Sequence, residues 1–369
     1  MEDGKHFFRK HLLEWFARNH RPLPWKGERD PYRIWLSEVI LQQTRVEQGL
    51  PYYQKFVERY PTVRLLADAP EDEVLKLWEG LGYYSRARNL HAAAKSIAQA
   101  GVFPDTYAGI RALKGVGDYT AAAIASFAFN LPYAVLDGNV YRVLARYFGI
   151  ATPTDTPAAK KQFAALAQEL LDPARPGDFN QAIMDFGATC CTPQQPGCAG
   201  CPLRSHCLAF QTGKVAGLPV KSKAPDKKKR FFIYLVARFQ GDTFVRKRAE
   251  KDIWQDLYEF PLLEVPEFPA DGGQLMQLIG HKMSGNAGAW KAGRITAVSP
   301  PYRQLLTHRV VTATFCEITF PDDCSPLIFE NPPFQNCRRI SVEDLKKNIA
   351  VPRIIDRYLK EKALTLTFF

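Results

Sequence analysis

Four cysteines gathered in one short loop constrain the fold of this chain more than any other feature of its sequence. The segment CTPQQPGCAGCPLRSHC, residues 191–207, separates Cys191, Cys198, Cys201 and Cys207 by six, two and five residues. The prolines and glycines between them supply the tight turns that let four thiolates face one point. Four thiolates suit either tetrahedral zinc or a 4Fe-4S cluster. Zinc sites usually pair two close cysteine couples across a longer loop, so this spacing favours one 4Fe-4S cluster.

The length and charge of the chain indicate two domains and a polyanionic partner. At 369 residues the chain exceeds the usual size of one domain. Its formal net charge of +11 favours nucleic acid over a small neutral ligand. Residues 1–20 are charged throughout, and no apolar run reaches the ~18 residues that span a membrane. We therefore expect no membrane contact and a reducing intracellular setting, in which cysteines are metal ligands or bystanders rather than disulfides.

The hydrophobic pattern changes once along the chain, and the change predicts the fold class. Up to about residue 212 apolar residues recur every three or four positions, which predicts helices. Residues 213–229 are rich in Lys, Pro and Gly, so we expect an exposed basic linker, either lying along phosphates or serving as a solvated tether. Beyond it, RFFIYLVARF, QGD and TFVRKR predict a β-hairpin, QLLTHRVVTATFCEITF predicts strands, and VPRIIDRYLKEK predicts a closing helix. The expected protein is multi-domain, with an all-α domain at 1–212 that holds the cysteine loop, a linker at 213–229 and an α+β domain at 230–369.

A glycine pair between two helical stretches predicts a phosphate-binding seat. In LKGVGDYTAAAIASF, residues 113–127, Gly115 and Gly117 allow backbone conformations that turn amide N–H groups outward. The N-terminus of the following helix adds positive potential at the same place. The alternative is a plain loop between two helices.

Two carboxyl groups beside apolar residues are the candidate catalytic pair. Asp137 begins a helix in AVLDGNVYRVLARYFG, where the helix dipole favours the ionised form, although a simple N-cap is the alternative. Glu38 shares a helix face with Ile34 and Leu41, and an apolar environment there would raise its pKa toward that of a general acid. The alternative for Glu38 is an exposed side chain at the helix margin. One protonated and one ionised carboxyl suit cleavage of an N-glycosidic bond through an oxocarbenium-like state.

Together these motifs resemble a known family of DNA repair enzymes. The cysteine spacing and the glycine pair resemble the endonuclease III superfamily of DNA glycosylases, whose domain contains a helix-hairpin-helix and a 4Fe-4S cluster loop. PLPWKGERDPYRIWLSEVILQQTRV and WEGLGYYSRARNLHAAA are similar to the signatures of adenine DNA glycosylases of the MutY type. The resemblance covers the first domain nearly throughout. It implies hydrolytic removal of an extruded adenine that lies opposite 8-oxoguanine or guanine in duplex DNA.

The resemblance also implies roles for individual residues. Glu38 is expected to protonate the purine and Asp137 to stabilise the sugar cation, while Tyr119 and Asn139 position the sugar and Asp137. Tyr119 stands where bifunctional members carry a catalytic lysine, so little or no strand cleavage is expected. The residues implied to contact the base stack are Gln43 and Tyr83, and those implied to line the adenine pocket are Arg21, Trp25, Leu41 and Gln181. For Trp25 the alternative is core packing.

The second domain resembles the Nudix fold. IWQDLYEFPLLE matches the W-E-F-P turn of the family, with Tyr258 in place of the tryptophan. The glutamate-rich metal box of Nudix hydrolases is missing from the sequence, so nucleotide hydrolysis is not expected. The resemblance implies a domain that reads 8-oxoguanine. The nearest match to its Phe-Ser-His motif is Leu306, Thr307 and His308, in which the hydroxyl and the imidazole are kept and the aromatic ring is lost.

The expected partner is duplex DNA that carries adenine opposite 8-oxoguanine or guanine, bound by a monomer in the cytoplasm of a bacterium, at the nucleoid. Three other functions stay open. They are a bifunctional glycosylase and lyase for oxidised pyrimidines, a DNA-binding redox sensor without catalysis, and a Nudix-type hydrolase of free oxidised nucleotides. Borohydride trapping would identify the bifunctional enzyme. Damage binding without base release would identify the sensor, and hydrolysis of free nucleotides with a divalent metal would identify the Nudix-type hydrolase.

Overall fold

The computed structural model divides the chain into two compact units, which we describe separately. It describes residues 2–19, 21–222, 226–267, 269, 271, 273–275, 277–278, 292–330 and 333–366. Unit 1 comprises Met1–Asp68 and Asn89–Ala224, and unit 2 comprises Ala69–Arg88 and Pro225–Phe369. One internal segment of the expected first domain, Ala69–Arg88, therefore groups with the second unit. No helix of the described residues is long and apolar enough to cross a membrane.

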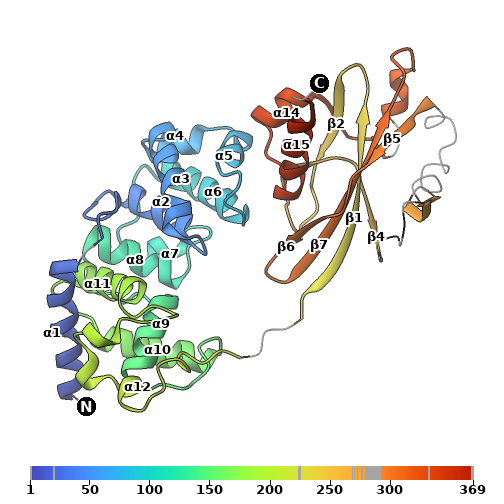
Figure 1. Cartoon of the computed structure of the whole chain (residues 1–369). Helices are drawn as coiled ribbons and strands as arrows, with labels where there is room; N and C mark the ends of the chain where they lie inside the picture. The colour runs from blue at the N-terminus through green and yellow to red at the C-terminus, as the bar shows by residue number, and fades with distance from the viewer. Residues whose placement is uncertain are drawn as a thin grey trace. The chain divides into compact units, whose positions relative to one another are not determined.

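The described part of unit 1 is built of helices, as the apolar period of three to four predicts (Figure 1). They are α1 (Glu2–Asn19), α2 (Pro31–Leu41), α3 (Val46–Arg59), α4 (Val63–Asp68), α7 (Tyr107–Ala112), α8 (Asp118–Phe129), α9 (Gly138–Tyr147), α10 (Pro157–Leu170), α11 (Pro176–Thr189) and α12 (Leu208–Gln211), with short 3₁₀ turns η1 (Cys198–Gly200) and η2 (Arg204–His206). Helix α5 (Glu71–Leu77) belongs to unit 2, and α6 (Ser85–Ala100) spans the division.

The segment between α8 and α9 is held in place by α11. Asn180 of α11 is buried, and its Oδ1 accepts a hydrogen bond from the Val135 N–H at 3.1 Å. Its Nδ2 donates to the Ser126 hydroxyl at 2.9 Å and to the Tyr133 carbonyl at 2.8 Å. Because these bonds are shielded from water, they fix the backbone that leads into Asp137.

The start of the expected linker packs against unit 1, which differs from the exposed tether that its composition predicts. The Thr154 N–H donates to the Val220 carbonyl at 3.0 Å, and Arg146 Nε donates to the Leu218 carbonyl at 3.0 Å. Leu218 is buried. A single apolar side chain in a Lys-, Pro- and Gly-rich stretch is enough to anchor it, and a periodic pattern does not reveal such an anchor.

Unit 2 combines two β-sheets with helices, so the predicted α+β class is confirmed (Figure 1). Its strands are β1 (Lys228–Arg238), β2 (Asp242–Lys247), β3 (Tyr258–Glu259), β4 (Leu262–Val265), β5 (Arg294–Val298), β6 (Tyr302–Leu305), β7 (Arg309–Thr319) and β8 (Arg338–Ser341), accompanied by η4 (Pro326–Glu330), α14 (Val342–Asn348) and α15 (Arg353–Leu366). One sheet has the order β4-β1-β7-β5, with β6 also paired to β7, and the other has the order β3-β2-β8. The predicted closing helix is α15.

Alternating side chains of β1 fill two separate cores. Phe232 and Tyr234 belong to a core that includes Tyr358 of α15, whereas Ile233 and Leu235 belong to the core on the opposite face. This period of two is the expected geometry of a strand that is buried on both faces. The parallel pairing of β1 with β7 extends from Lys228–Arg309 to Arg238–Thr319 and makes these strands the centre of the sheet.

The hairpin predicted from β1, its turn and β2 is wrong in its pairing. Both strands form, but β1 pairs with β4 and β7, whereas β2 pairs with β3 and β8. A single bridge between Phe239 and Asp242 closes the turn. Local sequence identifies the two strands, but partner choice depends on which face each strand must bury. The strands predicted in QLLTHRVVTATFCEITF, in contrast, form β6 and β7, which pair in antiparallel orientation.

Candidate active site

Glu38 is buried in α2, so the exposed glutamate that we considered as the alternative is not what the structure shows. Its exposed fraction is 6%. Burial raises the pKa of Glu38 to about 7, a hydrogen bond from Tyr119 opposes this rise, and the charge of Asp137 adds to it. A carboxyl group with this pKa retains its proton on a large share of molecules near neutral pH, which suits a general acid.

Tyr119 lies in the first turn of α8, where its hydroxyl is 3.9 Å from Met184 Sδ and within hydrogen-bonding reach of the Glu38 carboxyl group. Burial, followed by the charges of Glu38 and Asp137, raises the pKa of Tyr119 well above its usual range. The phenol therefore acts as a neutral hydrogen-bond donor. It cannot replace the amine that Schiff-base chemistry requires.

Asp137 is the N-cap of α9, as its position in the sequence predicts. Its Oδ1 accepts the Val140 N–H at 2.8 Å, and its Oδ2 accepts Asn139 Nδ2 at 2.8 Å. Burial raises the pKa of Asp137 above its usual value, although these hydrogen bonds and the nearby charge of Arg142 oppose part of the rise. Helix-dipole reasoning alone missed the burial. The hydrogen bonds stabilise the ionised form that a sugar cation requires.

Arg142 connects this carboxylate to the cysteine loop, and sequence reasoning missed it. Its Nη2 donates to Asn139 Oδ1 at 2.7 Å and to the Gly187 carbonyl at 2.6 Å, and its Nε donates to the Cys191 carbonyl at 2.7 Å. A continuous chain of hydrogen bonds thus runs from Asp137 through Asn139 and Arg142 to Cys191. The available sequence signal was an arginine within the apolar face of α9, where it is only 8% exposed.

Gly187 is a second residue that sequence reasoning missed. A Cβ atom at this position of α11 would lie 2.6 Å from Asn139 Cβ and 3.1 Å from the Asn139 carbonyl oxygen. Only glycine therefore lets α11 approach Asn139 closely enough for the Arg142 hydrogen bonds to form.

We expect Gly187→Ala to slow base excision by about 10- to 100-fold, because it displaces Asn139 and with it Asp137. Single-turnover excision rates and thermal unfolding would measure the effect. Gly4→Ala in α1 is the matched control, since an added Cβ there meets no heavy atom within 4 Å. The control should keep wild-type activity and gain about 0.5–1 kcal/mol of stability. Wild-type rates for Gly187→Ala would contradict the positioning role.

The glycine pair forms the hairpin between α7 and α8. Gly115 has a φ of +81°, and an added Cβ would lie 2.6 Å from Asn89 Cβ, so glycine is required there. Gly117 has an ordinary φ of −92°, and nothing lies within 4 Å of an added Cβ. Conformational freedom therefore explains Gly115 but not Gly117. The open space at Gly117 leaves room for a ligand to approach the start of α8, and the phosphate-binding role of both residues stays a prediction.

The cysteine loop encloses a cavity between α9, α11 and the two 3₁₀ turns. Cys191, Cys198, Cys201 and Cys207 all line it, together with apolar side chains such as Val143 and Phe186. Among the described residues, no three His, Cys, Asp or Glu side chains come close enough to share one metal ion. Four thiols around an apolar cavity fit a 4Fe-4S cluster with four protein ligands.

Cys190 lies on the same cavity and was missed as a member of it. Its position next to Cys191 breaks the cysteine spacing, so the sequence alone predicts a small buried residue here. In the structure Cys190 is half-buried and lines the cavity beside Cys191 and Cys201.

Gln43 and Tyr83, which we predicted to contact the base stack, share an unusual backbone conformation. Both are exposed, and their φ angles are +55° and +49°. Residues other than glycine rarely adopt left-handed conformations, and the strain is retained mainly at functional sites. Gln43 belongs to unit 1 and Tyr83 to unit 2. The predicted contact of each with the base stack stays a prediction.

The predicted adenine-pocket residues are half-buried, and the structure gives some of them other partners. The ring of Trp25 packs edge-on against the ring of Tyr53, with centroids 5.2 Å apart. This contact is of the kind expected if Trp25 serves in packing rather than in the adenine pocket. The backbone N–H of Arg21 lies 3.5 Å from Asp185 Oδ2. The pocket roles of these two residues, and those of Leu41 and Gln181, stay predictions.

In unit 2, the turn between β6 and β7 presents Thr307 and His308 to solvent. The Thr307 hydroxyl lies 2.7 Å from the hydroxyl of Tyr83. Leu306 is partly buried and packs against the core, whereas Leu305 is 63% exposed. The roles of Thr307 and His308 stay predictions.

The comparisons with known proteins agree with this helical site. Residues 36–171 match the family model of the HhH-GPD superfamily base excision DNA repair proteins. A thermostable thymine-DNA glycosylase has a similar structure, with a TM-score of 0.54, 30% identity, and coverage of 57% of this chain and 98% of its own. Endonuclease III in a non-covalent DNA complex, 21% identical with a TM-score of 0.50, shares the fold. The fold and the site thus define a helix-hairpin-helix DNA glycosylase.

The sequence relatives are more specific. The adenine DNA glycosylase of Buchnera aphidicola subsp. Baizongia pistaciae is 38% identical over 258 residues, which cover 69% of this chain and 73% of the relative. The adenine DNA glycosylase of Mus musculus is 38% identical over 313 residues, which cover 78% and 60%. The chain belongs to the adenine DNA glycosylases, enzymes of base excision repair.

Proposed function

We propose that this enzyme hydrolyses the N-glycosidic bond of adenine mispaired with 8-oxoguanine or guanine in duplex DNA, without cleaving the strand. One observation carries the catalytic part of the proposal. Glu38 is buried with a pKa of about 7, within hydrogen-bonding reach of Tyr119 and close enough to Asp137 to interact with its charge. Two carboxyl groups with unequal environments are the arrangement that glycosidic cleavage requires.

In the proposed reaction, the adenine is flipped out of the duplex and Glu38 gives its proton to the purine as the C1′–N9 bond breaks. The bonding electron pair leaves with the base, and the positive charge on the sugar is stabilised by the Asp137 carboxylate. Water then adds to C1′, and its proton passes to the Glu38 carboxylate, which restores the acid. Asn139 and Tyr119 hold the two carboxyl groups in position.

The absence of strand cleavage follows from the chemistry of Tyr119. A phenol whose pKa lies well above its usual range is neutral and has no amine to attack C1′. Borohydride should therefore trap no covalent adduct between the protein and the processed DNA. A stable adduct would support the bifunctional alternative.

We further propose that Cys191, Cys198, Cys201 and Cys207 hold one 4Fe-4S cluster. When bound, the cluster would tie the loop together and supply a redox centre without an open coordination position. The thiol-lined cavity supports this assignment. Arg146 donates to Cys191 Sγ at 3.4 Å and to the Thr192 carbonyl at 2.7 Å, and so holds the start of the loop on α9.

For unit 2 we propose a Nudix-like domain that recognises 8-oxoguanine opposite the adenine. The exposed Thr307 and His308 at the tip of the β6–β7 turn support this role, since their hydroxyl and imidazole groups suit hydrogen bonding to a base edge. We also propose that the enzyme acts as a monomer on DNA in the bacterial cytoplasm, at the nucleoid, and the net charge of +11 supports DNA as the partner.

The test uses duplexes with adenine opposite 8-oxoguanine, guanine or thymine, in single-turnover assays with and without alkali. We expect base release from the first duplex to exceed that from the second by at least about tenfold, and little release from the third. Strand breaks should appear only after alkali treatment. Equal release from all three duplexes, or breaks without alkali, would contradict the proposal.

A further inference from the structure

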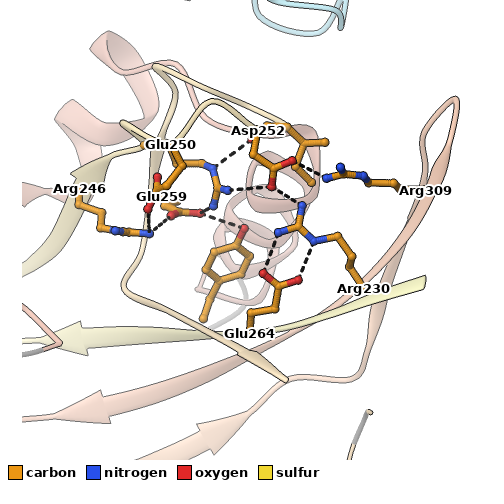
Figure 2. A network of polar contacts seen from close by, with 10 residues as sticks. Arg230, Arg246, Glu250, Asp252, Glu259, Glu264 and Arg309 are labelled. Atoms are coloured by element: carbon orange, nitrogen blue, oxygen red, sulfur yellow. Dashed lines mark hydrogen bonds and ion pairs between the residues drawn. The ribbon is translucent and has the colours of Figure 1, made fainter. Parts of the chain in front are cut away.

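A network of four arginines and four acids lies at one end of the sheets in unit 2 (Figure 2). At its centre Arg248, 3% exposed, donates to Glu259 at 2.6 Å, and Glu259 has no exposed surface. Tyr234 donates to Glu259 at 3.4 Å, and Arg246 pairs with Glu259 at 2.8 Å and with Glu250 at 3.1 Å. Pairs as buried as Arg248–Glu259 add little net stability, because desolvation offsets their attraction. Their better-supported use is to specify one arrangement of the chain.

Asp252 connects the buried part of this network to Arg230 and Arg309. Its Oδ2 accepts Arg230 and lies 3.8 Å from Arg248 Nη2, and its Oδ1 accepts Arg309. Arg230 is in turn fixed by two hydrogen bonds to Glu264, at 2.6 and 2.7 Å. Burial raises the pKa of Asp252, but its hydrogen bonds and the charge of Arg230 outweigh this and hold it at about 2. The carboxylate is therefore ionised throughout the working pH range.

Arg309 connects Asp252 to the β6–β7 turn, which we define as residues 306–308. It is the first residue of β7 and directly follows His308. Its carbonyl accepts the Leu306 N–H at 2.8 Å, which closes the turn. Asp252 thus holds the residue at which the turn ends.

The linker side holds the same turn independently. Lys227 Nζ donates to the Leu306 carbonyl at 2.9 Å, and the Lys228 N–H donates to the His308 carbonyl at 3.1 Å. The backbone of the turn is therefore fastened on both sides, while the side chains of Thr307 and His308 stay exposed. An exposed recognition tip on a fixed backbone is a preorganised site, which loses little conformational entropy on binding.

We propose that Asp252 is a positioning residue for discrimination of the base opposite the adenine, and that it acts through Arg309 on the β6–β7 turn. This inference rests on the proposed function of unit 2. It separates two properties of the enzyme, because the excision chemistry is assigned to residues of unit 1, whereas the preference for 8-oxoguanine over guanine depends on the held turn.

The test compares Asp252→Asn with wild type on the duplexes that carry 8-oxoguanine or guanine opposite adenine. We expect the preference for 8-oxoguanine over guanine, measured as the ratio of kcat/KM values, to fall about tenfold because of a change in KM. The single-turnover excision rate at saturating enzyme should change less than about twofold. Arg309→Gln should reproduce the loss, the double variant should add nothing further, and Arg309→Lys should restore part of it. Asp242→Asn is the control, since it removes an ion pair with Arg339 elsewhere in unit 2.

The outcomes separate the inference from the function on which it rests. If wild type shows no preference for 8-oxoguanine, the proposed function of unit 2 fails and the inference falls with it. If wild type shows the preference and folded Asp252→Asn keeps it, the inference alone is wrong. Additive losses in the double variant, or an equal loss in Asp242→Asn, would also overturn it. Should Asp252→Asn fail to fold, Arg309→Gln at the edge of the network decides the question by the same criteria.

Discussion

Replacing Glu38 by glutamine should slow adenine excision by about 10²- to 10⁴-fold, the usual contribution of a general acid. Glutamine fills the same buried space and can still accept the Tyr119 hydrogen bond, but it has no proton to give to the purine. Single-turnover rates on the duplex with 8-oxoguanine opposite adenine would measure the loss. Glu169→Gln is the control, because Glu169 lies exposed near the end of α10 and pairs only with Lys5 among the ion pairs of the described residues. Excision by Glu38→Gln at the wild-type rate would refute the acid assignment.

The same variant should also change the pH dependence of activity and stability. Activity that needs protonated Glu38 should fall as the pH rises through about 7. Because the pKa of Glu38 is raised from 4.5 to about 7 in the folded state, the fold keeps a proton that the unfolded chain releases between these values. Stability therefore falls with rising pH in this window, by up to about 3 kcal/mol. We expect Glu38→Gln to unfold at a higher temperature than wild type at about pH 8, and at a similar temperature near pH 4. Equal melting temperatures at both pH values would contradict the raised pKa.

Replacing Asp137 by asparagine should slow excision by about 10³-fold, since it removes the negative charge beside the developing sugar cation. Asparagine can still cap α9 through the Val140 N–H. Its amide nitrogen would then face Asn139 Nδ2, and Asn139 cannot turn its amide around without losing the hydrogen bond from Arg142. The variant therefore loses both the charge and the fixed direction of the hydrogen-bond chain. Single-turnover excision, combined with DNA-binding affinity, would show whether the loss lies in the chemical step.

Asp172→Asn is the matched control for Asp137→Asn. Asp172 also accepts a backbone N–H, from Ala174 at 3.0 Å, and lies near a basic side chain, Arg175 at 3.3 Å, outside the proposed site. We expect the control to keep wild-type activity. If Asp137→Asn excises adenine within about tenfold of wild type, the electrostatic role of Asp137 is wrong.

Sequence reasoning selected the three residues to which we assign the chemistry, but it missed two residues that position them. Glu38, Tyr119 and Asp137 have side chains whose type and local pattern indicate a function, and the structure brings all three together. Arg142 gives a weaker signal, an arginine within the apolar face of α9, and Gly187 gives none. Their importance arises from close contacts between α9 and α11, which only the packed structure reveals.

Sequence reasoning also did not predict which strands pair or that the start of the linker packs against unit 1. The local pattern placed β1 and β2 correctly but not their pairing, because each strand joins the sheet that buries its apolar face. Residues 213–220 read as a tether, since one buried leucine among Lys, Pro and Gly leaves no periodic signal. At Gly117 the φ of −92° is ordinary and an added Cβ would meet no atom within 4 Å, so neither backbone freedom nor a close contact explains the glycine.

The central claim is that Glu38 holds its proton near neutral pH within a buried pair of carboxyl groups. Carbon-13 NMR of protein labelled at the glutamate carboxyl carbons measures this directly, with Glu38→Gln assigning the resonance. We predict that the Glu38 signal titrates at about 7. Titration at its ordinary value of 4.5 would show that burial does not protect the proton, and would contradict the account.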